Sequence, residues 1–252
     1  MVGTEDIAAL FFELSSSSRL DIILKLDEQA LKLSQISKEL DMSIQEASRH
    51  IARLCDAKLV DKCQDGQYSL TPYGRQIRRL FPSMRFISEN SDFFSTHDFF
   101  VVPEQFHYGL GIIESYERSR HVMEAFRYTE ELIKNAEKFI WIHSDQVLSS
   151  ALPLIEDAVS RGVEFRLVLP SSIIEEDYGQ NTNAEIPENY RALVQQRFPE
   201  KVEMIIVMSE KEALLAFPDL EGKMDYVGFS VEGPKAIQWC EEIFLYFWNK
   251  AA

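Results

Sequence analysis

Residues 34–54, SQISKELDMSIQEASRHIARL, are the stretch from which the amino-terminal part of the chain is interpreted. Two short amphipathic helices fit it, separated by a polar turn at Asp41 and Met42. Ser34 and Ser43 are suited to cap these helices, because a serine oxygen accepts a hydrogen bond from a free N–H group in the first turn. The stretch therefore predicts two helices joined by a tight turn.

The second of these helices has one apolar and one polar side. At 100° per residue, the apolar arc holds Ile44, Ala47, Ile51 and Leu54. The opposite arc is centred on Arg49 and also holds Gln45, Glu46, Ala52 and Arg53. Such a helix can pack on a small domain and present Arg and Gln to a DNA major groove. The same pattern also fits an ordinary amphipathic surface helix.

Length and composition predict an ordered protein of two domains. The 252 residues are 46% hydrophobic and 12% aromatic, which is enough to form real cores. No apolar run approaches the roughly 18 residues needed to span a bilayer. The first ten residues, MVGTEDIAAL, are acidic and lack the basic segment of a signal peptide. We therefore expect a cytoplasmic protein with no membrane partner.

The net charge of −15 is unevenly distributed along the chain. Residues 1–87 hold 12 Lys and Arg against 12 Asp and Glu, whereas residues 88–252 hold 14 against 29. No acidic residue occurs between Asp65 and Glu89, where four arginines do. The acidic half is unsuited to bind DNA, so any DNA contact belongs to the first part. The asymmetry favours two domains with different partners.

The three cysteines, Cys55, Cys63 and Cys240, cannot all pair, and no CxxC motif is present. Cys55 lies near the inward arc of its helix and is expected to be buried. A metal or redox role for Cys55 with Cys63 is an alternative, although no His or Cys cluster supports it. We predict no metal site and no cofactor.

The elements predicted around residues 34–54 complete a small domain. Helices are expected at residues 5–14 and 19–27 and again from Pro72 onward. Between them, residues 59–63 and 68–70 form a predicted hairpin, because the Asp65-Gly66 pair supplies the positive φ angle that its turn needs.

This order of elements resembles the archaeal ArsR/MarR-type winged-helix transcription regulators. The resemblance is carried by LSSSSRLDIILKL (14–26), SQISKEL (34–40), SIQEASRHIARLCDAKLV (43–60) and KCQDGQYSLTPYG (62–74). It departs at Lys58, where the family usually has Gly, and it lacks the Cys-x-Cys of the metal-sensing branch. The resemblance implies a winged helix-turn-helix domain over residues 1–85 that binds double-stranded DNA.

Residues 86–252 predict an α/β domain. Strand, helix and strand at 138–144, 152–162 and 163–170 form a βαβ unit with a parallel pair. Further predicted elements are a helix at 114–137, a surface loop at 171–186, a helix at 188–197, a strand at 202–208, a hairpin of 211–217 with 224–231, and a helix at 234–250. We expect a mainly parallel sheet.

This second half resembles the methanogenesis-regulatory middle domain found behind such winged helices in archaeal regulators. The matching pieces are THDFFVVPEQF (96–106), FIWIHSD (139–145) with LPLIEDAVSRGVEFRLVLPSS (152–172), and DYVGFSVEGPKAIQWCEEIFLYF (225–247). The resemblance implies a phospholipase-D-like fold, related to that of the sugar-sensing TrmB-type regulators, and a role as effector or dimerisation domain.

Catalysis is not expected. Phospholipase-D-type chemistry needs a His with a Lys two residues later, and none of the five histidines has one. His143 and Asp145 are two residues apart but have no basic partner nearby. No phosphate-cradling glycine loop or hydrolase motif is present. A phosphodiesterase or nuclease targeted by a winged helix is the alternative function, and a winged helix that binds protein is a third.

The predicted DNA contacts fall into three groups. Gln45 and Arg49 are expected to read base edges. Arg53, Ser34, Ser43 and Ser48 are expected to hold phosphates, with Glu46 beside them. Lys62, Gln64 and Gln67 of the wing would reach a neighbouring groove or the backbone. Because this domain has few cations, one copy is expected to bind DNA weakly. We therefore expect a homodimer built from the first helix and the helix after Pro72.

The second half is predicted either to sense a small-molecule effector or to serve only in dimerisation. In open α/β sheets, ligands favour the crevice at the carboxyl ends of the strands. Residues expected at that edge are His143, Ser144, Asp145, Ser171 and Ser172, flanked by Trp141 and Arg166.

Overall fold

The computed structural model describes residues 3–113, 115–146, 148–173 and 193–251. The chain divides into two compact units, one extending to Phe81 and the other beginning at Pro82. This division falls four residues before the domain boundary predicted from the sequence. It lies inside one helix, α5 (Pro72–Glu89), at a proline that cannot donate a backbone hydrogen bond.

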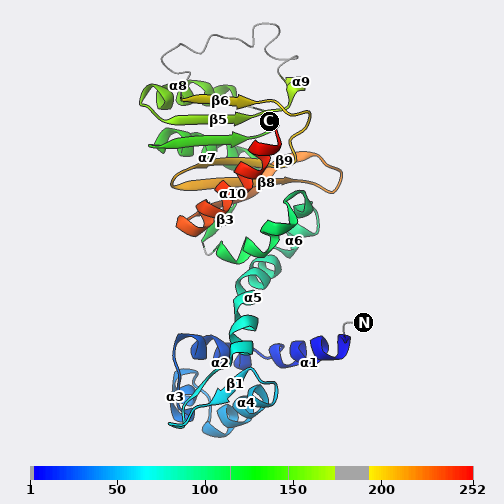
Figure 1. Cartoon of the computed structure of the whole chain (residues 1–252), viewed down its shortest axis with the longest axis vertical. Coiled ribbons are helices and arrows are strands. Elements are labelled where there is room, and N and C mark those ends of the chain that lie inside the picture. Colours follow the sequence, from blue (N-terminus) through cyan, green and yellow to red (C-terminus); the bar gives the residue numbers. More distant parts are fainter. Residues whose placement is uncertain (1–2, 114, 147, 174–192, 252) are drawn as a thin grey trace. The chain divides into compact units, whose positions relative to one another are not determined.

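The first unit contains five helices and a two-stranded hairpin among its described residues (Figure 1). They are α1 (Thr4–Leu14), α2 (Ser17–Glu28), α3 (Leu33–Glu39), α4 (Ile44–Asp56), β1 (Val60–Lys62), β2 (Tyr68–Leu70) and the start of α5. The core packs the inward faces of α2, α3 and α4 against the hairpin, and its members include Ile22, Leu26, Ile36, Ile51, Leu54 and Leu70. The predicted helices and hairpin are all present.

The turn of the hairpin has the predicted chemistry. Gly66 adopts a φ angle of 81°, and the N–H of Cys63 donates to the carbonyl oxygen of Gln67 over 2.7 Å. The hairpin is followed by Gly74, where an added Cβ would lie 2.0 Å from the carbonyl oxygen of Leu59. The first turn of α5 therefore approaches the end of the helix-turn-helix too closely for a side chain.

The second unit is built on a seven-stranded sheet with the order β3-β9-β8-β7-β4-β5-β6. The strands are β3 (Tyr116–Arg118), β4 (Phe139–His143), β5 (Glu164–Val168), β6 (Val194–Arg197), β7 (Ile205–Ser209), β8 (Glu212–Pro218) and β9 (Met224–Glu232). Helix α10 (Pro234–Lys250) and the 3-10 helix η2 (Glu104–Ile112) contribute to the core on one face, whereas α7 (Val122–Asn135) and α8 (Leu152–Ser160) contribute to the core on the other. The remaining short elements are α6 (Ser91–Phe94), η1 (Phe99–Val101), η3 (Ser149–Ala151) and α9 (Ser171–Ile173).

The prediction of a mainly parallel sheet is wrong. Only the β4–β5 and β5–β6 pairs are parallel, and the other four pairs are antiparallel. Strands β7, β8 and β9 follow one another through short turns, and a short turn can join only antiparallel neighbours. The predicted β4–α8–β5 unit and the β8–β9 hairpin are both present. The sheet is therefore mixed and mostly antiparallel.

Two predicted helices are corrected in part. The helix expected at 114–137 begins only at Val122, because residues 116–118 form the edge strand β3. Of the helix expected at 188–197, residues 194–197 are strand β6, which pairs with β5. The rest of that segment and most of the predicted 171–186 loop lie outside the described residues. The carboxyl-terminal helix matches its prediction, with Cys240 and Phe244 fully buried.

Candidate nucleic-acid interface and ligand pocket

Helix α4 is fixed by a cap at its start and by a buried arc along its length. The hydroxyl of Ser43 accepts a hydrogen bond from the N–H of Glu46 over 3.2 Å, as predicted. Ala47, Ile51 and Leu54 are buried in the core of the first unit. His50 is also buried at 8% exposure, and burial lowers its pKa. The helix is therefore held in one rotational setting.

The outward arc of α4 carries the side chains predicted to read DNA. Gln45, Ser48 and Arg49 are exposed, and so is Ala52. Arg49 forms no salt bridge with any residue in the described ranges. Ile44 was predicted to be buried, but its side chain is 57% exposed. Ile44 is the first residue of α4. The first residue of this helix that belongs to the core is Ala47, three positions later.

Ser34 does not cap α3 as predicted. The helix begins at Leu33, so Ser34 lies inside its first turn and is exposed. The backbone N–H of Lys32 is instead satisfied by the side-chain oxygen of Gln35, over 2.8 Å. A glutamine three residues after the capping position thus binds the N–H of the capping residue itself, as in one half of a capping box. Ser34 remains on the exposed side of the helix-turn-helix.

Arg53 is held by a residue that the sequence reasoning did not single out. Its Nε and Nη2 atoms donate to the two carboxylate oxygens of Glu13, over 3.0 and 2.6 Å. The guanidinium also lies 5.0 Å from the ring centre of Phe12. The hydrogen bond from Arg53 lowers the pKa of Glu13. Forty residues separate the partners, so no local pattern indicated this bidentate pair.

Glu13 is itself anchored at the end of α1 by a buried arginine. Arg19 is 6% exposed and lies 3.2 Å from the Glu13 carboxylate. Its Nε and Nη2 atoms also donate to the carbonyl oxygens of Glu13 and Phe12, which are among the last carbonyls of α1. Arg19 thus satisfies acceptors that the helix leaves free at its carboxyl end. Through Glu13, the end of α1 is tied to the last turn of α4.

The wing places its polar residues on the surface. Lys62 and Gln64 are exposed, and Gln67 is partly exposed. Lys62 lies 5.8 Å from the ring centre of Tyr68 across the hairpin. The N–H of Gln67 donates to the side chain of Asp65, which shapes the turn. The ordered hairpin therefore presents these three polar side chains at the surface.

The predicted ligand residues of the second unit do not converge on one place. Trp141 and His143 lie on the face of the sheet that α10 covers. Arg166 stacks on that same face, 4.6 Å from the ring centre of Trp141. Ser144 lines a pocket on the opposite face. The Asp145 carboxylate accepts a hydrogen bond from Tyr226, which also lines that pocket. Ser171 and Ser172 are exposed in α9.

His143 is a core residue rather than a ligand-facing one. Its side chain is 1% exposed and stacks on Phe247, with ring centres 4.7 Å apart. Its Nδ1 atom lies 2.7 Å from the carbonyl oxygen of Met204, which assigns the proton to Nδ1. Burial lowers the pKa of His143 to about 4, despite the opposing effect of that hydrogen bond. The ring is neutral and enclosed at physiological pH.

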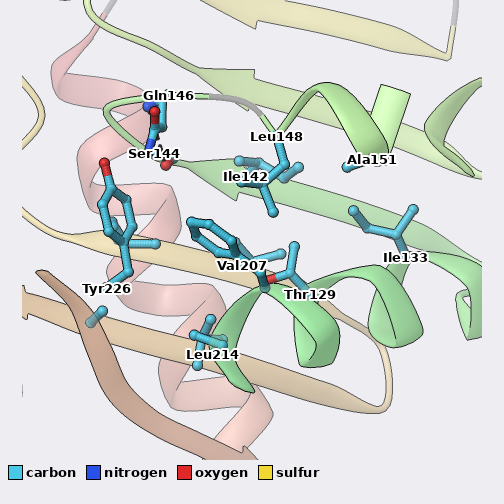
Figure 2. Close-up of a pocket in the computed structure, with 14 residues that line it drawn as sticks. Thr129, Ile133, Ile142, Ser144, Gln146, Leu148, Ala151, Val207, Leu214 and Tyr226 are labelled. Atoms are coloured by element: carbon cyan, nitrogen blue, oxygen red, sulfur yellow. Dashed lines mark hydrogen bonds between the residues drawn. The ribbon is translucent and has the colours of Figure 1, made fainter. Parts of the chain in front are cut away.

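A small pocket lies between α7 and the sheet (Figure 2). It encloses about 40 Å³, which is room for about three water molecules. Its walls are mostly apolar, and Figure 2 shows Tyr226, Ser144 and Gln146 at one end. The hydroxyl of Tyr226 lies 3.1 and 3.0 Å from the two carboxylate oxygens of Asp145, whose pKa is raised by burial.

Tyr226 reaches this position through an unusual backbone. Its φ angle is +62°, a left-handed conformation that few residues other than glycine adopt. It lies in β9 close to a register shift against β8. Strain of this kind is found most often where a side chain is held for a specific purpose. Here it directs the ring into the pocket wall, 5.6 Å from that of Phe126.

No group of three or more His, Cys, Asp or Glu side chains in the described ranges could hold a metal ion. Cys55 and Cys63 are free, and burial raises the pKa of Cys55. None of the described helices has both the length and the apolar character needed to cross a bilayer.

Comparison with protein families identifies the first unit. Residues 18–89 match the model of the family described as winged helix-turn-helix. These residues form a winged helix-turn-helix domain. The match spans α2 to the end of α5 and so includes both α4 and the wing. It confirms the domain type that the sequence predicts.

Solved structures show distant similarity to the chain. TrmBL2, an archaeal chromatin protein whose structure shows a novel mode of DNA binding, has 13% identity, with 94% of each chain covered and a TM-score of 0.45. Nuc, a phospholipase D family member from Salmonella typhimurium, has 13% identity over 55% of this chain and 95% of its own, with a TM-score of 0.37. NucT from Helicobacter pylori has 9% identity over 54% and 97%, with a TM-score of 0.38. No curated protein matches the chain.

The buried state of His143 predicts how acid affects the second unit. Between its ordinary pKa of 6.5 and about 4, the unfolded chain binds a proton that the folded unit does not. The free energy of unfolding therefore falls as the pH falls through this window, by about 3 kcal/mol from this group alone. We expect His143→Gln to remove this part of the pH dependence.

Urea unfolding at several pH values, followed by tryptophan fluorescence, measures this effect. Trp141, Trp239 and Trp248 all belong to the second unit, so the signal reports on that unit alone. His121→Gln is the matched control, because His121 is exposed. An equal pH dependence in the wild type and in His143→Gln would contradict the assignment.

Proposed function

We propose that the protein is a DNA-binding transcription regulator whose winged helix-turn-helix domain inserts α4 into a major groove. The observation that carries this proposal is the outward arc of α4. Gln45, Ser48 and Arg49 are exposed side by side, while the opposite arc is buried in the core. An exposed Arg and Gln on a helix rigidly held by its domain are suited to bidentate recognition of guanine and adenine.

The proposed role of each side chain follows from its position in the domain. Arg49 and Gln45 read base edges, and Ser43 and Ser48 hold phosphates near the start of α4. Ser34 contacts phosphate from α3, and Glu46 orients the first turn of α4 through its bond to Ser43. Lys62, Gln64 and Gln67 contact the backbone or the adjacent groove from the wing. Arg53 supports the backbone contacts, although its charge is shared with Glu13.

Substitution of Arg49 by Ala tests the reading role. We expect Arg49→Ala to lose discrimination between the preferred sequence and unrelated DNA by roughly 1–3 kcal/mol, because one bidentate base contact disappears. Band shifts over a series of salt concentrations, with the preferred sequence taken from a genomic DNA pull-down, measure both affinities. Equal discrimination by the wild type and by Arg49→Ala would contradict this role.

Arg53→Ala is the matched control, since it removes the same charge from the same helix. Because Arg53 donates to Glu13, we expect Arg53→Ala to weaken binding to all DNA sequences alike and only slightly. If the wild type bound no DNA sequence specifically, the whole assignment would fail. A winged helix that binds protein would then be favoured.

We further propose that the protein acts as a homodimer through α5 and α1. In the part of α5 that belongs to the first unit, Tyr73, Ile77 and Leu80 follow the 4-3 spacing of a coiled-coil seam. Tyr73 and Leu80 are 45% and 48% exposed, and Ile77 is partly buried. Helix α1 has no buried residue and exposes Ile7, Phe11 and Phe12. A seam of this kind is self-complementary, so a second copy is its fitting partner.

The variant Tyr73→Glu/Leu80→Glu tests the dimer. Two carboxylates in the seam of each copy repel their counterparts, so we expect a monomer that keeps its helical circular dichroism and binds DNA much more weakly. Sedimentation equilibrium measures the molecular mass. Leu220→Glu is the control, because Leu220 is 70% exposed in the turn after β8. A wild-type monomer at tens of micromolar would contradict the proposal.

We also propose that the second unit senses a small molecule at the pocket beside α7. Apolar walls with a few convergent polar groups are the usual make-up of a ligand site. Here Tyr226, Ser144 and Gln146 supply the polar end, and the hydrogen bond from the Tyr226 hydroxyl to Asp145 and the strained backbone at Tyr226 hold that ring in place. The enclosed volume admits only the end of a ligand. A domain that serves only in dimerisation needs no such arrangement.

Thermal denaturation with a panel of metabolites tests the sensing role. A specific ligand raises the melting temperature by mass action, because it binds only the folded unit. We expect Tyr226→Phe, which removes the hydroxyl but keeps the ring, to reduce that shift. Equal shifts in the wild type and in Tyr226→Phe would place the binding elsewhere.

A further inference from the structure

Ile44 occupies an unexpected place for a large apolar residue. It is the first residue of α4 and directly follows the serine that caps the helix. Its side chain is 57% exposed and is absent from the core cluster to which Ala47 and Ile51 belong. Burial in the folded domain therefore does not account for an isoleucine here.

Ile44 lies between the buried arc of α4 and the side chains proposed to read DNA. At 100° per residue, Ile51 lies 20° and Ser48 lies 40° from Ile44 around the helix axis, whereas Gln45 and Arg49 lie 100° and 140° away. Ser48 is one turn further along and is too short to cover the isoleucine. Ser48 and Gln45 are exposed as Ile44 is, so the exposed surface at the amino-terminal end of α4 combines one apolar side chain with polar ones.

The major groove contains one apolar feature that such a side chain can recognise. Thymine carries a C5-methyl group there, whereas cytosine, guanine and adenine present only polar groups or ring C–H. Residues at the amino-terminal end of a recognition helix are those that contact base edges. Contact between the thymine methyl and an exposed aliphatic side chain removes apolar area of both from water.

We infer that Ile44 is a specificity-determining residue that selects a thymine by contact with its C5-methyl group. This inference rests on the proposed insertion of α4 into the major groove. It adds one T·A base pair to the site, next to the base pair read by Gln45. The polar residues of the arc cannot recognise the methyl group itself, because it neither donates nor accepts a hydrogen bond.

The test replaces thymines singly by deoxyuridine, which differs only in lacking the methyl group. The full-length protein is titrated with its preferred DNA sequence, identified by pull-down, and with each substituted version. We expect one thymine position at which deoxyuridine weakens the wild type about fourfold, the effect of one buried methyl group. In Ile44→Ala the same replacement should have no effect.

Two further arms separate the possible explanations. Ile44→Val, which keeps a branched aliphatic group, should retain part of the sensitivity, and Leu220→Ala, another exposed apolar residue, should retain all of it. Wild-type insensitivity at every thymine, or full sensitivity in Ile44→Ala, would overturn the inference while leaving DNA binding intact. Absence of any sequence-specific DNA binding would overturn the proposed function and this inference together.

Discussion

Burial of one arc of α4 determines what the first unit can bind. Ile51 and Leu54 are 2% and 0% exposed, and they cannot turn outward without opening the core. Because successive residues rotate by 100°, fixing this arc also fixes the outward direction of Gln45, Ser48 and Arg49. The Ser43 cap fixes the position of the first turn as well. Recognition by a rigid helix thus depends on apolar packing that never touches the ligand.

In the second unit, the pleat of β4 determines which side chains can share a ligand site. Successive side chains of a strand point to opposite faces, so Trp141 and His143 go to the α10 side while Ile140 and Ile142 go to the α7 side. Residues that are adjacent in the sequence are therefore separated by the full thickness of the sheet. A ligand site at the end of β4 can use one set only, and the pocket lies with Ser144 on the α7 side.

Local patterns predicted most of the first unit, because its helices, its Ser43 cap and its Asp65-Gly66 turn depend on nearby residues. Local patterns did not predict features that depend on residues far away in the sequence. The helical wheel placed Ile44 on the apolar arc, but in the three-dimensional structure its side chain is 57% exposed and lies outside the core cluster. Likewise, VQQR at 194–197 has no strand-like apolar alternation and becomes β6 through its pairing with β5. The candidate ligand residues are likewise divided between the two faces of the sheet, because successive side chains of β4 point to opposite faces.

The bond between Arg53 and Glu13 connects the surface proposed to bind a second copy with the helix proposed to bind DNA. Glu13 ends α1, whose exposed Phe11 and Phe12 are suited to a second copy, and Arg53 belongs to the helix proposed to enter DNA. Arg19 holds the same carboxylate from a buried position, so the three groups move together. A shift of α1 caused by dimer contacts would therefore be transmitted to α4 through a bidentate pair with fixed geometry. In the proposed dimer, this arrangement would link the contacts of α1 to the last turn of α4, while the buried arc keeps the rotational setting of that helix fixed.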